Sequence, residues 1–241
     1  MKIRFILMLI LCCELPGFGQ INYTTEDSTH IIWQPGMNLS FEDFQGIPSE
    51  KEMDMFRKYN LTASAAIGIW SVLNVPKKKR DRGKKREKVY FAPAFSKVGS
   101  SAISPDSMQI AIQEVYFDIA ELSARWARRE LQSMQYKMNG YGTLYIMYTT
   151  VEKDMQDKYR QMIGVYTKEV IVEKKPGAYE SWSAFYDEML EETKEWATTP
   201  EECHRHLTGK PTEPGYEKSP TVAGPIYPVL VRQGSSRSGF L

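Results

Sequence analysis

Apolar and polar side chains alternate between residues 63 and 75, and this two-residue period predicts a half-buried strand. Residues 88–95 predict a second strand, residues 30–33 a short first one, and residues 41–44 a short helical turn or loop that packs aromatic side chains. The polar stretch between the two longer strands is expected to be a long hairpin loop. The buried side of the first long strand should carry Ala65, Ile67, Ile69, Leu73 and Val75.

A period of three to four residues then predicts a long helix. Ser104-Pro105-Asp106-Ser107 is a suitable start, with Asp or Ser as the cap. The helix should run to about residue 138, because Asn139-Gly140 predicts its end. Its apolar stripe consists of Met108, Ile112, Val115, Ile119, Leu122 and Trp126.

Two further helices are predicted after it. Lys175-Pro176-Gly177 predicts a turn, and residues 179–196 predict a helix that is acidic on its outer face. The helix before the turn is marked by Leu144, Met147, Val151, Met155, Tyr159, Met162 and Tyr166. Together these elements predict an α+β fold, in which a small antiparallel or mixed sheet packs on the long helix and on two further helices.

The first 19 residues have the features of a secretory signal peptide. Lys2 and Arg4 give a positive start, and residues 5–13 form an apolar run too short to span a bilayer. A lipoprotein signal is the alternative, because Cys12 and Cys13 follow Leu-Ile-Leu, but the small residue expected just before the modified cysteine is missing. We therefore expect export, with the protein in the periplasm or outside the cell.

Removal of residues 1–19 leaves one domain over residues 20–207 and a Pro/Gly-rich tail over residues 208–241. The tail holds five Pro and five Gly, with an apolar cluster at residues 226–231 that is expected along a sheet edge or a groove. The only cysteine left is Cys203, so no internal disulfide forms and stability must come from a packed core.

Charge is balanced overall but unevenly placed. Without residues 1–19 the formal net charge is zero, which gives no indication of nucleic-acid binding. Residues 77–88 nevertheless carry nine basic and two acidic side chains. This basic run is interpreted either as a solvated turn or as a patch for anionic partners such as lipid phosphates or acidic polysaccharide. The nine cations are Lys77, Lys78, Lys79, Arg80, Arg82, Lys84, Lys85, Arg86 and Lys88.

The long helix resembles the zinc-binding helix of a family of secreted bacterial zinc-peptidase-like proteins of unknown function. The family reads His-Glu-x-x-His-Phe-Asp-Ile-x-Glu-Leu where residues 112–122 read IQEVYFDIAEL. Residues 33–48 (WQPGMNLSFEDFQGIP) resemble the family's opening motif, and residues 155–159 (MQDKY) resemble the segment before its third histidine, which should fall near Val165. The resemblance covers about residues 31–166 and implies a zincin-like fold.

The zinc-binding residues themselves are lost. Ile112 and Tyr116 stand at the two histidine positions, and Gln113 stands at the glutamate that polarises the metal-bound water. Asp118 and Glu121 remain from the motif, and we expect them to pair with Arg125 or Arg128. The resemblance therefore implies a pseudoenzyme, with no cofactor.

One other cluster has metal-binding side chains. Cys203, His204 and His206 lie too close in sequence to enclose a metal alone, although a loop can use two of them. The first interpretation is a catalytically inactive protein with a binding or structural role, whose partner is a protein, peptide or glycan of the envelope. The first alternative is an active hydrolase with non-standard ligands from Glu114, Asp118, Glu121 or the Cys203–His206 cluster. The second is an envelope-anchored protein that binds anionic surfaces through residues 77–88.

Overall fold

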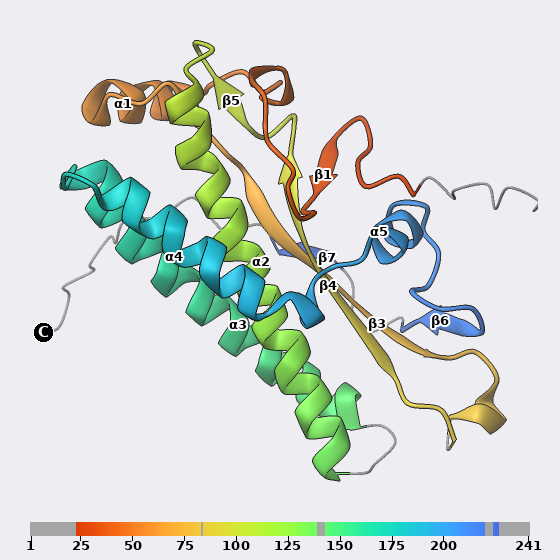
Figure 1. Cartoon of the computed structure of the whole chain (residues 1–241). Coiled ribbons are helices and arrows are strands. Elements are labelled where there is room, and N and C mark those ends of the chain that lie inside the picture. Colours follow the sequence, from red (N-terminus) through yellow and green to blue (C-terminus); the bar gives the residue numbers. More distant parts are fainter. Residues whose placement is uncertain (1–22, 83, 139–142, 220–223, 227–241) are drawn as a thin grey trace, which may run out of the picture.

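An antiparallel sheet of five strands forms the centre of the computed structural model, which describes residues 23–82, 84–138, 143–219 and 224–226 (Figure 1). The spatial order is β1 (His30–Ile32), β4 (Lys88–Ser96), β3 (Ile67–Pro76) and β6 (Tyr216–Lys218). The remaining strand, β7 (Gly224–Ile226), also pairs with β3, at Ile69 to Ser71, whereas β6 pairs at Asn74 to Pro76. A separate ladder joins β2 (Ala63–Ser64) to β5 (Ser101–Ala102).

Both faces of the sheet are buried. Odd- and even-numbered positions of β3 and β4 both carry apolar side chains, so each face of the sheet packs into a cluster. Ile67, Ile69 and Leu73 belong to the main core, together with Phe91 and Phe95 of β4. The opposite face forms a smaller cluster, made of Ile32, Trp70, Val72, Tyr90, Ala92, Ala94, Cys203 and Leu207. The prediction of a half-buried strand is therefore wrong for β3, since α5 (Pro200–Leu207) covers its second face.

Three long helices lie on the side of the first face, and the first two contact the sheet directly (Figure 1). The longest, α2 (Ser107–Met138), contacts β4, β3, α3 (Thr143–Thr167) and α4 (Ala178–Glu192). A π-helical segment (Lys168–Val172) follows α3, and a short 3₁₀ turn (Lys194–Trp196) follows α4. No helix in the described ranges has the length and apolar character needed to cross a bilayer.

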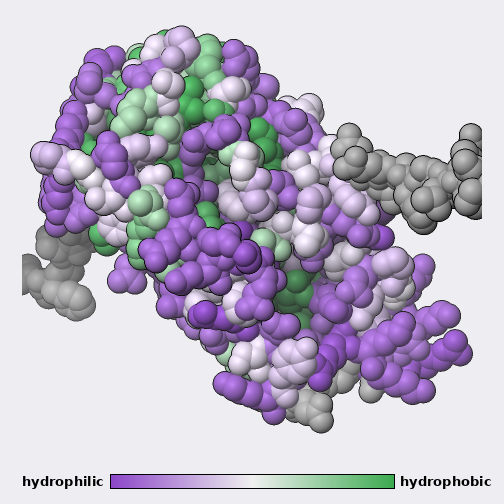
Figure 2. Space-filling model, viewed as in Figure 1, coloured by the Kyte–Doolittle hydropathy of each residue, from purple (hydrophilic) through white to green (hydrophobic). Residues whose placement is uncertain are grey.

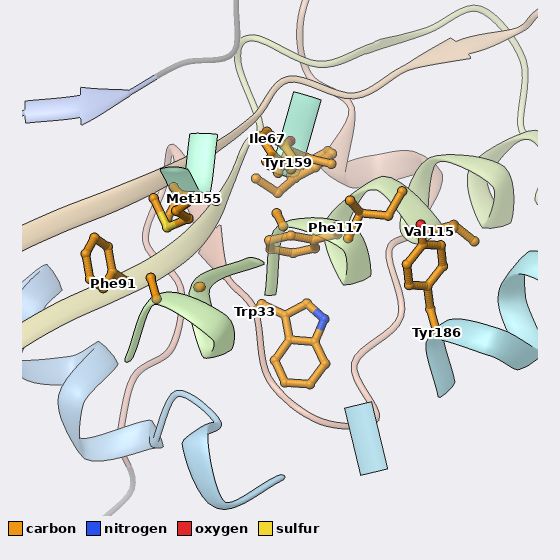
Figure 3. Packing of buried hydrophobic residues seen from close by; sticks show 14 of the residues in the cluster. Trp33, Ile67, Phe91, Val115, Phe117, Met155, Tyr159 and Tyr186 are labelled. Atoms are coloured by element: carbon orange, nitrogen blue, oxygen red, sulfur yellow. The ribbon is translucent and has the colours of Figure 1, made fainter. Parts of the chain in front are cut away.

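The core lies between α2, α3 and the sheet. Figure 3 shows Ile67 and Tyr159 on one side of Phe117 and Trp33 on the other. Phe117 is 2% exposed and Trp33 is 5% exposed, so a residue that follows β1 packs directly under the middle of α2.

The structure confirms the α+β class, the two long strands joined by a hairpin, and the three long helices at their predicted places. Two short helices were missed, α1 (Glu50–Tyr59) and α5, and each begins with a capping box that the sequence carries, at Ser49 with Glu52 and at Thr199 with Glu202. Part of the segment after residue 207 pairs with β3 through β6 and β7. The predicted signal peptide with Cys12 and Cys13, and residues 227–241, lie outside the described residues.

Candidate functional site

The face of α2 that carries the resemblance is part of the packed interior. Ile112 is 7% exposed and Gln113 is 5% exposed. Gln113 Oε1 accepts a hydrogen bond of 3.0 Å from the amide of Ala65, which joins α2 to the segment between β2 and β3. Glu114 Oε1 accepts a hydrogen bond of 2.5 Å from the amide of Leu39, and burial raises the pKa of the Glu114 carboxyl. Two adjacent polar side chains thus hold loop backbone against the helix.

The end of α3 packs against the same face. The hydroxyl of Tyr166 donates to the carbonyl of Ile112 at 3.0 Å, and the rings of Tyr116 and Tyr166 meet edge to face with centroids 4.9 Å apart. The hydroxyl of Tyr116 lies 2.8 Å from Thr167 Oγ1, and burial raises the pKa of Tyr116 to about 12. Val165, near which the third histidine was placed, is 42% exposed, so its neighbour Tyr166 is the residue that faces α2.

These side chains do not fit a zinc ion. Ile112 has no donor atom, and Gln113 carries an amide that takes up no proton near neutral pH. Tyr116 is a partly buried phenol that keeps its proton at neutral pH. Within the described ranges, no group of three His, Cys, Asp or Glu side chains is arranged to hold a metal ion.

Asp118 keeps a polar partner, but not the expected one. Its Oδ1 accepts a hydrogen bond of 2.9 Å from the indole Nε1 of Trp33, so the expectation of an ion pair with Arg125 or Arg128 is wrong for this residue. Burial raises the pKa of Asp118 to about 7, although the indole hydrogen bond opposes the shift. Nearby carboxylates add to the rise, namely Asp187, Glu114 and Glu121.

Glu121 is the centre of a buried ion-pair network, as its helical spacing to the arginines predicts. It is fully buried, and its Oε1 lies 2.8 Å from Arg125 Nε and 3.4 Å from Arg128 Nη1. Both oxygens also accept hydrogen bonds from Thr198, at 3.2 Å from the amide and 3.2 Å from the hydroxyl. The arginines in turn donate to the carbonyls of Leu190, Trp196 and Phe91. This network joins α2 to the end of α4 and to β4.

Cys203, His204 and His206 do not point toward a common centre. They lie on the short helix α5, and each side chain contacts a different part of the structure. Cys203 is fully buried and accepts a hydrogen bond of 3.0 Å from Gln34 Nε2. His206 stacks on Tyr90, with ring centroids 4.9 Å apart, and meets the edge of Trp70 at 5.0 Å.

His204 turns instead toward the segment before β1, where its Nδ1 accepts from the amide of Thr24 at 3.3 Å. Burial raises the pKa of the Cys203 thiol to about 12 and lowers the pKa of His206 to about 4. At neutral pH the cluster therefore presents a protonated thiol and a neutral imidazole.

Small cavities flank the connection between α3 and α4. One of about 160 Å³ is lined in part by Leu61, Ile112, Val170 and Lys174. A second, of about 370 Å³, lies at the start of α4 and is lined in part by Lys175, Trp182 and Phe185. Three tyrosines of α3 are core residues, since Tyr148, Tyr159 and Tyr166 are at most 1% exposed.

The basic run forms the outer part of the β3–β4 hairpin, away from the face of α2 described above (Figure 1). No family model matches the chain, and the comparisons with curated proteins and with solved structures likewise find no match.

Proposed function

We propose that the protein is an exported, catalytically inactive relative of the zinc peptidases with a zincin-like fold, and that its role in the envelope or outside the cell is binding or structural. The observation that supports this proposal is that the residues at the expected ligand positions form hydrogen bonds within the core. Gln113 holds the Ala65 amide, Tyr116 contacts Thr167, and the carbonyl of Ile112 accepts from Tyr166. The end of α3, where the resemblance places the third histidine, lies against these same positions.

A second candidate is a hydrolase that uses carboxylates in place of the lost ligands. Its support is Asp118, whose pKa of about 7 suits proton transfer near neutral pH. Glu121 argues against it, because its oxygens are engaged by Arg125, Arg128 and Thr198. The structural role therefore remains the better account of this face.

Peptide cleavage separates the two candidates. The purified protein is incubated with a mixed peptide library, with and without added Zn²⁺, and products are identified by mass spectrometry. Inactivity predicts no cleavage above a heat-treated control. Cleavage that is lost in both Asp118→Asn and Glu114→Gln, and retained in the exposed-site control Glu188→Gln, would establish the hydrolase instead.

A further inference from the structure

The outer part of the β3–β4 hairpin is a concentrated positive surface. Eight of its nine cations are exposed, and only Arg82 is half-buried. Figure 2 shows hydrophilic side chains over this projecting end, at the lower right of the view. A 3₁₀ turn (Lys79–Asp81) shapes the tip.

Few carboxylates neutralise this surface. Arg82 pairs with Glu217 at 2.6 Å and Lys88 with Glu213 at 2.9 Å, so the base of the hairpin is tied to the segment around β6. Oδ1 of Asp81 lies 3.9 Å from Nε of Arg80, and Oδ2 of Asp81 lies 4.0 Å from Nζ of Lys85. No carboxylate of the described chain forms an ion pair with the remaining five cations, which are Lys77, Lys78, Lys79, Lys84 and Arg86.

An exposed tyrosine lies beside the cations. The guanidinium of Arg86 stands 4.7 Å over the ring of Tyr136, which is 62% exposed near the end of α2. Glu87 accepts a hydrogen bond from the amide of Leu144 at 3.1 Å, which holds the hairpin against the start of α3. Two residues further on, Ile146 is 73% exposed. An exposed Tyr next to Arg is a combination that settles at a membrane–water interface, and Ile146 adds an exposed apolar side chain in the first turn of the helix that Glu87 contacts.

We propose that this surface, formed by residues 77–88 with Tyr136 and Ile146, docks the protein onto a bilayer that contains anionic phospholipids. Lysines and arginines near such a surface are attracted to its phosphates, and this attraction weakens as salt screens it. Tyr136 is the one aromatic ring of this surface, and Arg86 stands over it, whereas single-stranded nucleic acids stack successive bases on several rings, which disfavours a nucleic acid as the partner. The proposal goes beyond the function proposed above and does not depend on the loss of the zinc site.

Vesicle co-sedimentation of the purified protein tests the proposal. Vesicles of phosphatidylcholine with phosphatidylglycerol should bind at low salt, and vesicles of phosphatidylcholine alone should not. Binding should decline as the Debye length falls from about 30 Å at 0.01 M salt to about 10 Å at 0.1 M. Inorganic polyphosphate in solution is the comparison, because binding to it without binding to vesicles would overturn the membrane assignment.

Two charge variants locate the contact. The hairpin variant replaces Lys77, Lys78, Lys79, Lys84, Lys85 and Arg86 with Ser, and it should lose roughly 100-fold or more in vesicle binding at low salt. Its melting temperature should stay nearly unchanged, because these side chains are exposed. The control variant removes the same number of exposed cations elsewhere and should keep most of the binding; it replaces Lys51, Arg57, Lys58, Arg160, Lys168 and Lys194 with Ser.

A third variant tests the interfacial side chains. Tyr136→Ser with Ile146→Ser should weaken vesicle binding severalfold and leave its salt dependence unchanged. Equal losses in the hairpin and control variants would mean that net charge alone drives binding, and would overturn the proposal. A large loss of folding stability in the hairpin variant would assign the cations a structural role, and unchanged binding in the third variant would exclude the interfacial contact.

Discussion

The indole Nε1 of Trp33 donates a hydrogen bond of 2.9 Å to Oδ1 of Asp118, 85 residues further along the chain. The guanidinium of Arg125 stands over the same indole ring, 5.0 Å from its centroid. Trp33 therefore contacts both a half-buried carboxyl and a buried cation of α2. These contacts fix the segment after β1 to the helix that carries the zinc-peptidase resemblance.

The raised pKa of Asp118 predicts a pH dependence of folding. In the folded state the carboxyl binds a proton below about pH 7, whereas in the unfolded chain it does so only near the ordinary aspartate pKa of 3.8. The free energy of unfolding should therefore fall as the pH rises from about 4 to about 7.

Asp118→Asn should remove this component and be more stable than the native protein at pH 8, by roughly 1–3 kcal/mol. Denaturant unfolding at pH 5 and pH 8 measures the difference, with Glu188→Gln as the exposed control. A stability difference between Asp118→Asn and the native protein that does not change with pH would contradict the assignment.

Loss of the Glu121 charge should be strongly destabilising. Glu121→Gln leaves Arg125 and Arg128 without their buried counter-charge, and we expect a loss of roughly 3–5 kcal/mol in the free energy of unfolding. Asp157→Asn is the matched control, because Asp157 pairs with Lys153 and Arg160 on the exposed side of α3, where water and salt screen the pair and its loss should change stability little. Similar losses in the two variants would show that the buried network contributes no more to the free energy of unfolding than an exposed ion pair does.

His206 should make the protein less stable in acid. Its pKa is lowered to about 4, mainly by burial and further by Lys218. Between about pH 6.5 and pH 4 the imidazole is therefore protonated in the unfolded chain but neutral in the folded protein. Stability should fall as the pH drops from 6.5 to 4, by about 1–2 kcal/mol at pH 5. His206→Phe keeps a ring against Tyr90 and Trp70 and should lose this part of the pH dependence. If the variant and the native protein show the same fall between pH 7 and pH 5, His206 is not the group responsible.

Restoring the metal-binding residues should not restore the site. The variant Ile112→His, Gln113→Glu, Tyr116→His places polar groups in a packed face and removes the contact between Tyr116 and Thr167. We expect a loss of roughly 1–3 kcal/mol in stability and weak zinc binding, because residues 31–203 supply no third histidine. Calorimetric titration with Zn²⁺ and denaturant unfolding measure both quantities. Tight binding in a variant as stable as the native protein would show that the site is still preorganised.

The spacing of apolar residues predicted most of the fold. The helices α2, α3 and α4 and the two long strands are long enough for that spacing to repeat several times. The short helices α1 and α5 have too few turns for that, although their capping boxes at Ser49 and Thr199 were available signals. Trp70 and Val72 also signalled that the second face of β3 is buried. The pairing of β6 and β7 with β3 joins residues more than a hundred positions apart, which no local period encodes.

The candidate site was predictable only in part. The spacing from Glu121 to Arg125 predicted an ion pair, because both lie on one helix face one turn apart. The contact between Trp33 and Asp118 joins residues 85 positions apart, and it depends on the tertiary placement of the segment after β1 against α2. The divergence of Cys203, His204 and His206 depends on the helical form of α5, which is too short to show a period in the sequence.

The zinc content of the protein purified from its native compartment tests the central claim most directly. Ile112, Gln113 and Tyr116 offer no zinc ligands, and the carboxylate of Glu121 is engaged by two arginines. We therefore predict far less than one zinc ion per chain after dialysis. Retention of about one zinc ion per chain would contradict the account, and would direct attention first to Cys203, His204 and His206.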